Sequence, residues 1–355
     1  MKILFIVPYS TEGASNRFRV EQYLPYLDKE GIEYDVRPFV SSRFYKILYS
    51  RKAIIKKIAY FILAFLGRVL DIIRLPMYDL VFIHRESCPF GPPIFEWLIC
   101  KFKKAIIYDF DDAVFLENYN LANKFYRFFK FPSKTKDIIR MSAVVIVPNL
   151  FLKEYVSKFN KNVHILPTPI DSDKFKITKR ASDKVVIGWI GSFTTAPYLK
   201  LIFNVMQELS KKYKFTLKIC GAAGPINIPG VEIENHDWCL EEEVGHFQSI
   251  DIGIYPLADT LWERGKAGFK AIQYMSVGVS VVASSIGMNK EIIQNGVNGF
   301  LVSSDEEWVE KISRLIDDPA LREKIGFAGR KTVEGKYSVK INAPKYLEII
   351  KKVNK

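Results

Sequence analysis

Three aspartates lie close together in the stretch YDFDDAVF, residues 108–115, at a spacing that could do chemistry. Asp109, Asp111 and Asp112 include an Asp-x-Asp pattern, and such carboxylates can hold Mg²⁺ or Mn²⁺, which prefer oxygen ligands. A metal held in this way can bind a nucleotide diphosphate. The alternative is that these side chains only cap the turn after a strand. The second half of the chain has to decide between the two.

A second candidate site lies in ERGKAGFKAIQYMSVGVSVVAS, residues 263–284. Glycines precede a helix that we expect to begin near Phe269, and the N–H groups at a helix N-terminus attract anions. A helix would also place Lys266, Lys270 and Gln273 along one stripe. Two cations and a helix N-terminus suit a diphosphate, and Gln273 could hydrogen-bond a ribose hydroxyl. The alternative is a solvated lysine face on an amphipathic helix.

The elements that must position these residues begin with Val- and Ile-rich runs in the first half of the chain. Such runs, separated by longer mixed segments, predict a parallel sheet covered by helices on both faces, with right-handed crossovers. A helix is expected over 16–31, ending at Gly31. The expected strands are ILFIVPY (3–9), YDVRPFV (34–40), DLVFIH (79–84), KAIIYDF (104–110), AVVIVPN (143–149) and VHILPTP (163–169).

A polar segment without apolar periodicity, IDSDKFKITKRASDK, then interrupts the pattern, and a second series of buried runs follows from VVIGWIG onward. This indicates two doubly wound domains that face a cleft, with ligands beyond the carboxyl ends of the strands. The predicted division is an N-terminal Rossmann-like domain (1–170), a linker (171–184), a C-terminal Rossmann-like domain (185–336) and a C-terminal helix (337–355).

Several motifs in the second half occur in the order found in one enzyme family. QYMSVGVSVV, Glu291 and NGVNGFLV follow one another, and DDPALREKIGFAGRKTVEGKYS closes the series. This segment resembles the donor-binding region of the retaining glycosyltransferases of family 4, which have the GT-B fold. DIGIYPL, IGWIGS and the first strand extend the resemblance over most of the chain. It is most similar to a bacterial branch associated with capsule, O-antigen and other surface polysaccharides.

The resemblance implies roles for the basic residues, together with a departure. The family has a pair of glutamates, but here Gln273 takes the second place and the first falls at Gly265. The usual Arg and Lys after the first strand of the second domain are also missing. Lys266 and Lys270, with Arg264, are therefore expected to replace these cations and to bind the donor with Gln273. A weakened or inactive enzyme remains the alternative.

Three further residues of the second domain take roles from the same resemblance. Gly191 and Ser192 end its first strand, where backbone N–H groups could meet phosphate oxygens. Glu291 matches the family's Glu near the transferred sugar, which makes it a candidate catalytic residue. The alternatives are a plain strand-to-helix turn for the first two and a carboxylate favoured by a helix dipole for Glu291.

In the first domain, the loop TEGASNRFR follows the first strand. Gly13 would let this loop approach the donor, and Arg17 or Arg19 could point into the cleft and bind the acceptor. His84 ends a strand at the spacing where the family carries an active-site His, and Arg85 next to it could contact the acceptor. Surface salt bridges for the arginines and a structural role for His84 are the alternatives.

The resemblance also bears on the aspartates. GT-B enzymes bind the diphosphate with Lys, Arg and helix N-termini and generally need no metal, so no metal and no cofactor are expected. Asp111 or Asp112 would then bind acceptor hydroxyls or orient Arg17 or Arg19. Capping of the following turn stays open.

The composition describes a globular chain with an excess of positive charge. The 355 residues suffice for two domains, 48% are hydrophobic, and the net charge is +13. Residues 43–75 mix basic and apolar side chains, but the uncharged stretch Ile58–Gly67 is far short of the roughly 20 residues of a membrane span. It suits a helix in the membrane interface, as does a second basic run at 124–136. The alternative for both is an ordinary domain helix.

The N-terminus and the cysteines favour the cytoplasm. The apolar run in MKILFIVPYS is too short for a secretory signal, and the four cysteines follow no metal-ligand spacing and are typical of reduced thiols. The expected location is therefore the cytoplasm, with a possible peripheral position at the inner face of the cell membrane.

These observations predict a transferase acting on a nucleotide-diphosphate sugar, with retention of configuration, departure of the diphosphate at Lys266 and Lys270, and a glycan or polyprenyl-diphosphate-linked acceptor. A nucleotide-sugar 2-epimerase of the same fold and a catalytically silent nucleotide-sugar-binding protein are the alternatives. Charge alone would also suit a nucleic-acid binder, but no recognised nucleic-acid motif supports it, and no nucleic-acid partner is expected.

Overall fold

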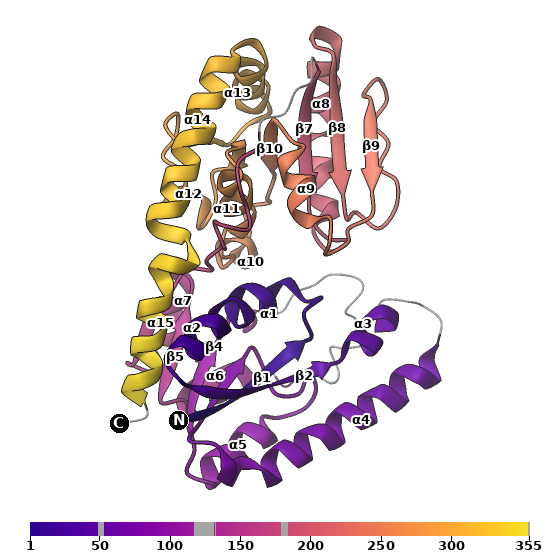
Figure 1. Ribbon diagram of the computed structural model, residues 1–355. Coiled ribbons are helices and arrows are strands. Elements are labelled where there is room, and N and C mark those ends of the chain that lie inside the picture. Colours follow the sequence, from indigo (N-terminus) through magenta and orange to yellow (C-terminus); the bar gives the residue numbers. More distant parts are fainter. Residues whose placement is uncertain (49–52, 117–130, 132, 179–183, 354–355) are drawn as a thin grey trace. The chain divides into compact units, whose positions relative to one another are not determined.

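The computed structural model describes residues 1–48, 53–116, 131, 133–178 and 184–353 (Figure 1). The chain forms two compact units: unit 1 comprises Met1–Pro169 and Asn342–Lys355, and unit 2 comprises Ile170–Ile341.

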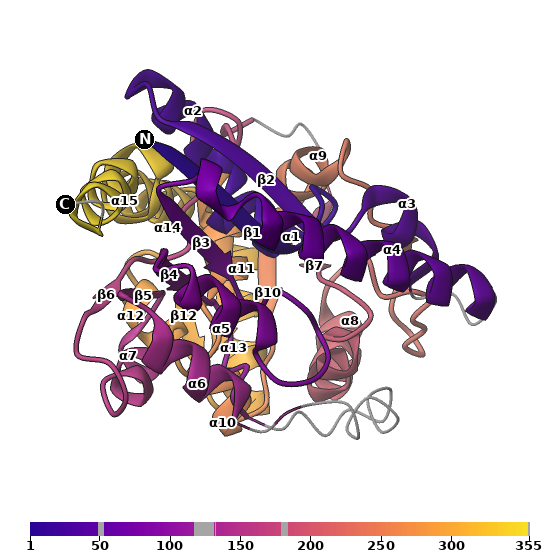
Figure 2. The same ribbon diagram turned by 90° about the horizontal axis from the view of Figure 1, so that it is seen from below.

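Unit 1 is built on a six-stranded parallel sheet. Its strands are β1 (Lys2–Tyr9), β2 (Glu33–Val40), β3 (Leu80–His84), β4 (Ala105–Asp109), β5 (Val144–Val147) and β6 (Val163–Ile165). They pair in the order β2-β1-β3-β4-β5-β6, as Figure 2 shows from below. All residues of β3 and β5 are buried, because helices cover both faces. The expectation of a covered parallel sheet is confirmed.

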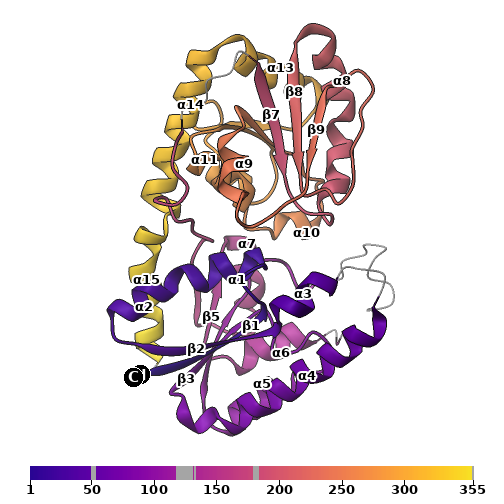
Figure 3. The ribbon, with the colours of Figure 1, turned by 45° about the vertical axis from the view of Figure 1, so that its right-hand side comes forward.

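Helices α1 and α2 lie on one face of this sheet, and α4 and α5 lie on the other (Figures 1 and 3). The single helix expected over 16–31 is wrong: it is divided into α1, a 3-10 turn at Glu21–Tyr23, and α2. Pro25, which has no N–H and is tolerated in a first helical turn, lies at the start of α2. The helices are α1 (Ala14–Arg19), α2 (Leu24–Lys29), α3 (Ser42–Leu48), α4 (Ile54–Ile73), α5 (Ile94–Lys101), α6 (Lys134–Met141) and α7 (Leu150–Val156).

Unit 2 has a second six-stranded parallel sheet. Its strands are β7 (Val185–Ile190), β8 (Phe215–Cys220), β9 (Ile233–His236), β10 (Ile252–Tyr255), β11 (Ser280–Ser284) and β12 (Phe300–Val302). Their order is β12-β11-β10-β7-β8-β9. The helices are α8 (Phe203–Lys212), α9 (Glu243–Gln248), α10 (Leu261–Arg264), α11 (Phe269–Ser276), α12 (Asn289–Ile292), α13 (Asp305–Asp317) and α14 (Pro319–Thr332). One core cluster joins α8 and α13 to the strands through Met206 and Trp308.

The segment expected to be a linker, 171–184, lies in unit 2 as far as the structure describes it. Phe175 is buried, with its ring centroid 6.2 Å from that of Phe247, and Ile170 N, directly before the segment, donates to Tyr337 O at 2.8 Å. A buried aromatic side chain and a backbone pairing tie this segment to the unit, which the polar composition did not reveal.

The last helix, α15 (Val339–Val353), contributes residues to both units. Within unit 1, Tyr346 stacks on Tyr23 with ring centroids 4.0 Å apart. Over the described residues, no helix is long and apolar enough to span a membrane. The basic run at 124–136 falls mostly outside the described residues.

Candidate functional site

Both sheets have a point where the strand order reverses, and such a point collects the loops that hold ligands in doubly wound folds. In unit 1 the reversal lies between β1 and β3, and in unit 2 between β7 and β10. The residues that follow these four strands are therefore the best candidates for ligand binding. Each unit has its own group of such residues.

In unit 1, the strand register brings His84 and Asp109 together. The two residues are direct partners at the carboxyl ends of β3 and β4, and both are buried. His84 Nδ1 lies 2.7 Å from Asp109 Oδ2. Because an ionised carboxylate only accepts hydrogen bonds, Nδ1 carries the proton of this bond. The other ring nitrogen, Nε2, is hydrogen-bonded to the hydroxyl of Ser15 in α1. The orientation of the imidazole is thus fixed from both sides.

Asp109 also neutralises a buried arginine. Arg19 is 1% exposed, and its guanidinium donates to both carboxylate oxygens of Asp109, with Nε 3.1 Å from Oδ2. It also donates to Leu166 O at 2.8 Å. Burial raises the pKa of Asp109, but Arg19 and the bond from His84 outweigh it and lower the pKa. Arg19 therefore has a buried structural partner rather than a surface salt bridge.

The other two aspartates hold Arg85. Arg85 has φ +63°, in the left-handed region, and its Nε donates to Asp111 at 2.9 Å while Nη2 donates to Asp112 at 2.6 Å. Burial raises the pKa of Asp111, but the charge of Arg85, followed by those of His84 and Arg19, lowers it well below its usual range. Asp111 also accepts a bond from Ser15 at 3.0 Å.

The expectation that Asp111 or Asp112 binds acceptor hydroxyls or orients Arg17 or Arg19 stays a prediction. Asp109 binds Arg19, because its position on β4 faces α1, whereas the two aspartates beyond the strand reach Arg85. Among its contacts, Arg17 donates to the carbonyl oxygens of Thr11 and Glu12, at 3.0 and 3.2 Å.

Gly13 comes just before α1 in the same loop, and its position has little free space. A Cβ atom at this residue would lie 2.5 Å from Tyr9 Cβ. The close approach that this glycine permits in the structure is therefore to the end of β1.

In unit 2, the candidate cations lie around the start of α11. The helix begins at Phe269, and Gly268 before it has φ +65°, a conformation that interrupts a helix. Lys266 thus lies outside the helix, and the expected stripe of Lys266, Lys270 and Gln273 is wrong. Lys270 and Gln273 do share the helix, with Lys270 Nζ 3.3 Å from Gln273 Oε1. The N-terminus of α11 is at the carboxyl edge of the sheet, since the helix follows β10 and leads back to β11.

Tyr274 fixes α11 against β7. Its buried hydroxyl donates to Gly188 O and accepts from Ile190 N, both at 3.0 Å. Gly253 in β10 makes room for the ring, because a Cβ atom there would lie 2.5 Å from it. The charges of Lys218 and then Lys270 oppose the burial that raises the pKa of the Cys220 thiol, at the end of β8, to about 11.

Glu263 was not singled out by the sequence as a site residue, yet it is 2% exposed at this edge. It accepts hydrogen bonds from the hydroxyls of Tyr198 and Thr260, and Lys266 Nζ lies 3.9 Å away. Arg264 is directed elsewhere, since it forms two hydrogen bonds to Asp259, at 2.7 and 3.0 Å, and is half exposed.

The two residues after β7 have their amides engaged. Gly191 N donates to Cys220 O at 3.0 Å, and Ser192 N donates to Thr195 Oγ1 at 3.1 Å. Gly191 has no room for a side chain, because a Cβ atom would lie 2.2 Å from the Trp189 ring. These two N–H groups therefore donate to protein acceptors in the structure. The sequence instead predicts that they donate to phosphate oxygens.

Glu291 lies in the short helix α12 and is exposed. Partial burial raises the pKa of its carboxyl, and its charge in turn adds to the burial that raises the pKa of Tyr337 to about 12. The structure therefore does not bring Glu291 into the hydrogen-bonded groups described above.

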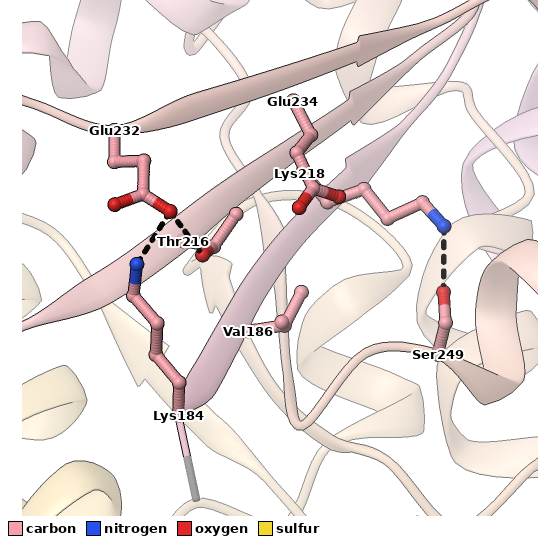
Figure 4. A pocket seen from close by; sticks show the side chains of 7 residues that line it. All are labelled: Lys184, Val186, Thr216, Lys218, Glu232, Glu234 and Ser249. Atoms are coloured by element: carbon pink, nitrogen blue, oxygen red, sulfur yellow. Dashed lines mark hydrogen bonds and ion pairs between the residues drawn. The ribbon is translucent and has the colours of Figure 1, made fainter. Parts of the chain in front are cut away.

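A hollow of about 310 Å³ opens on another part of unit 2 (Figure 4). It is lined by Lys184, Val186, Thr216, Lys218, Glu232, Glu234 and Ser249, and it does not include the residues that follow the carboxyl ends of the strands, where ligands are expected. Within its wall, Lys184 forms an ion pair with Glu232, and Lys218 donates a hydrogen bond to Ser249 Oγ at 2.8 Å. The hollow thus has the composition of an exposed sheet face.

No group of three or more His, Cys, Asp and Glu side chains in the described part of the chain is arranged to hold a metal ion. The oxygens of the aspartate cluster instead accept from Arg19, His84 and Arg85. Unit 1 thus carries a charge-paired hydrogen-bonding network at its carboxyl edge, and unit 2 carries Lys266 and Lys270 around the start of α11.

Residues 184–318, all in unit 2, match the family model described as glycosyl transferases group 1. CapM, a capsular polysaccharide biosynthesis glycosyltransferase of Staphylococcus aureus, is 26% identical over 189 residues, which cover 48% of this chain and 48% of that protein. The chain thus spans about half the length of this curated relative.

Two solved structures are similar over nearly the whole chain. HepE of Anabaena, in complex with UDP-glucose, has a TM-score of 0.69 at 14% identity and covers 99% of this chain and 100% of its own. A putative UDP-N-acetylglucosamine 2-epimerase of Listeria monocytogenes has a TM-score of 0.63 at 14% identity, with 99% and 95% covered. This likeness confirms the two-domain GT-B fold and leaves the chemistry to the site residues.

Proposed function

We propose that the protein is a GT-B glycosyltransferase that moves a sugar from a nucleotide-diphosphate sugar to a glycan or lipid-linked glycan acceptor. One observation carries the proposal: the segment that matches the group 1 family model contains Lys266 and Lys270, and these lie at the carboxyl edge of the unit 2 sheet around the start of α11. A lysine pair beside a helix N-terminus suits a diphosphate.

In the proposed reaction, the diphosphate departs with its developing charge stabilised by Lys266, Lys270 and the N-terminus of α11. The acceptor hydroxyl attacks from the same face and loses its proton to the departing phosphate, so the configuration is retained and no metal is required. Gln273 would bind the donor ribose, and Glu291 would act near the transferred sugar. The His84 network and Arg85 of unit 1 would bind acceptor hydroxyls.

The proposed role is in surface polysaccharide synthesis, with a polyprenyl-diphosphate-linked acceptor at the inner face of the cell membrane. Its support is the motif order in residues 273–338 and the similarity to CapM, whose name places that relative in capsular polysaccharide biosynthesis. The excess of positive charge would also favour an acceptor that carries a diphosphate.

The first experiment is a thermal-shift screen against a panel of nucleotide sugars, with UDP-glucose and UDP-N-acetylglucosamine among them. At a concentration of about 100 times Kd, a ligand adds about 2.7 kcal/mol to the unfolding free energy. Lys270→Ala should lose about 1.4 kcal/mol of that, a tenfold weaker affinity. Lys211→Ala, an exposed lysine in the last turn of α8, is the matched control and should keep the full stabilisation.

Product analysis then separates the reaction classes. Transfer of labelled sugar to a membrane extract supports the proposal. Release of an epimerised sugar nucleotide without acceptor would assign the chain to the epimerases, whose fold it shares. Binding of a nucleotide sugar without any turnover would identify a catalytically silent binding protein. This outcome is tested because Gln273 takes the place of a glutamate of the family.

A further inference from the structure

Helix α4 has its charged and apolar sides the wrong way round for a helix in water. Arg68 and Asp71 point inward and are 2% and 5% exposed. The Arg68 guanidinium donates to Asp71 at 2.9 Å, to Ser87 O at 2.7 Å and to Arg37 O at 2.9 Å. The polar groups that would normally face solvent therefore anchor the helix to unit 1.

Beyond Lys56 in its first turn, the outward side of α4 is apolar. Ten large apolar side chains of this helix are at least 38% exposed. The most exposed are Ile54 (66%), Ile55 (84%), Leu63 (63%) and Ile73 (65%). Monomeric soluble proteins rarely expose a continuous apolar surface of this kind, so the face is expected to be covered by something other than water.

The apolar face continues onto α5, which lies next to α4 on the same side of the sheet (Figure 3). Phe65 of α4 packs against Phe95 of α5, with ring centroids 5.2 Å apart. Beside this contact, Ile94 and Trp97 of α5 are 54% and 52% exposed. Trp97 has the Lys101 ammonium 4.9 Å above its ring. An amphipathic ring beside a lysine is typical of side chains at a membrane–water interface.

The charges around this face identify what covers it. Lys56 in the first turn of α4, Arg74 after its end, and Lys101 and Lys103 at the end of α5 are all exposed. Within α4, all of which the structure describes, the one acidic residue is the inward-facing Asp71. An apolar strip bordered by cations and lacking outward carboxylates complements a surface that is apolar inside and anionic at its headgroups.

We infer that the α4–α5 face, defined by the outward apolar residues of α4 together with Ile94, Trp97 and Phe102, docks on an anionic lipid bilayer. The helix lies in the plane of the interface, with its apolar side among the acyl chains and the lysines at the headgroups. This inference goes beyond the proposed reaction, because it holds whether or not sugar transfer takes place.

The test is sedimentation of the full chain with vesicles of equimolar phosphatidylglycerol and phosphatidylcholine, and with vesicles of phosphatidylcholine alone. We expect binding to the anionic vesicles that weakens in about 0.5 M NaCl, where the headgroup charge is screened. The variant Ile55→Gln, Leu63→Gln, Leu70→Gln should lower the partition coefficient at least about tenfold, since it removes apolar surface that enters the bilayer. Because all three side chains are more than half exposed, the urea midpoint should not fall.

The matched control replaces three exposed apolar residues elsewhere, Leu150→Gln, Leu201→Gln and Phe327→Gln, and should bind vesicles like the wild type. Equal binding of the α4 variant and this control would overturn the inference, and so would wild-type binding that does not depend on phosphatidylglycerol. A wild-type dimer in sedimentation velocity that the α4 variant abolishes, with no vesicle binding, would show that a second copy covers the face. Loss of sugar transfer with vesicle binding intact would overturn only the proposed function.

Discussion

At the carboxyl edge of the unit 1 sheet, Arg19 and Arg85 form close ion pairs with aspartates, whereas at the same edge of the unit 2 sheet Lys266 lies 3.9 Å from Glu263 and Lys270 lies 3.3 Å from an amide oxygen. The Arg19–Asp109 pair is buried, and buried ion pairs are expensive to break, so the first edge is rigid and internally balanced. The second edge places Lys266 and Lys270 around the N-terminus of α11. This difference supports the proposal that unit 1 binds neutral hydroxyls and that unit 2 binds an anion.

The largest expected effect is the loss of stability when the buried Arg19–Asp109 ion pair of unit 1 is broken. Asp109→Asn removes the counter-charge of Arg19 while it preserves the shape of the side chain, and an uncompensated buried charge costs about 3–5 kcal/mol. Urea denaturation should show a loss of this size. The control is Glu30→Gln, which breaks the exposed pair with Lys351 in the same unit and should cost about 0–1 kcal/mol. If both variants lose the same amount, the network of unit 1 is no more rigid than its surface.

The pH dependence of stability should differ in sign between the two edges, because ionisation of Asp111 stabilises the fold and ionisation of Glu291 destabilises it. The pKa of Asp111 is lowered in the folded state, so its stabilisation is present above the unfolded value of about 4 and is lost as the pH falls through the lower folded value. Asp111→Asn should therefore be less stable than the wild type at pH 7, by about 2 kcal/mol, and the difference should shrink below about pH 4.

The pKa of Glu291 in unit 2 is raised by burial, so the sign is opposite. Its ionisation opposes folding, and Glu291→Gln should be slightly more stable than the wild type at pH 7, with the gain disappearing as the pH falls below the unfolded value. Unfolding free energies of the three proteins between pH 3 and 7 provide the measurement. Parallel curves for the two variants would remove the electrostatic contrast between the edges.

The sequence could predict the framework of this comparison but not its details. Continuous Val and Ile runs identify strands that are buried on both faces, and the parallel sheets follow from them. The pairing of His84 with Asp109 depends on the register between β3 and β4. The sequence of either strand alone does not determine that register. The exclusion of Lys266 from α11 depends on the φ of Gly268.

Side-chain direction was also beyond the sequence. Both acidic and basic side chains appear in the stretch around α11 and α4, and only packing decides which of them turn inward. Glu263 is buried beneath two hydroxyl groups, although Arg264 next to it is half exposed. The aspartate cluster likewise had several chemical interpretations until its arginine partners were located.

The smallest expected effect concerns Arg264, which the sequence grouped with the donor-binding lysines. Its guanidinium is committed to Asp259 in an exposed pair, which is worth about 0–1 kcal/mol. Arg264→Gln should therefore change neither the unfolding free energy nor the affinity for a nucleotide sugar by more than about 1 kcal/mol, in contrast to Lys270→Ala. Isothermal titration with the donor found in the thermal screen measures the affinities of both variants, and urea denaturation measures their unfolding free energies. A tenfold loss for Arg264→Gln would mean that the pair with Asp259 opens when the diphosphate binds, and the cationic edge of unit 2 would then extend from α11 to α10.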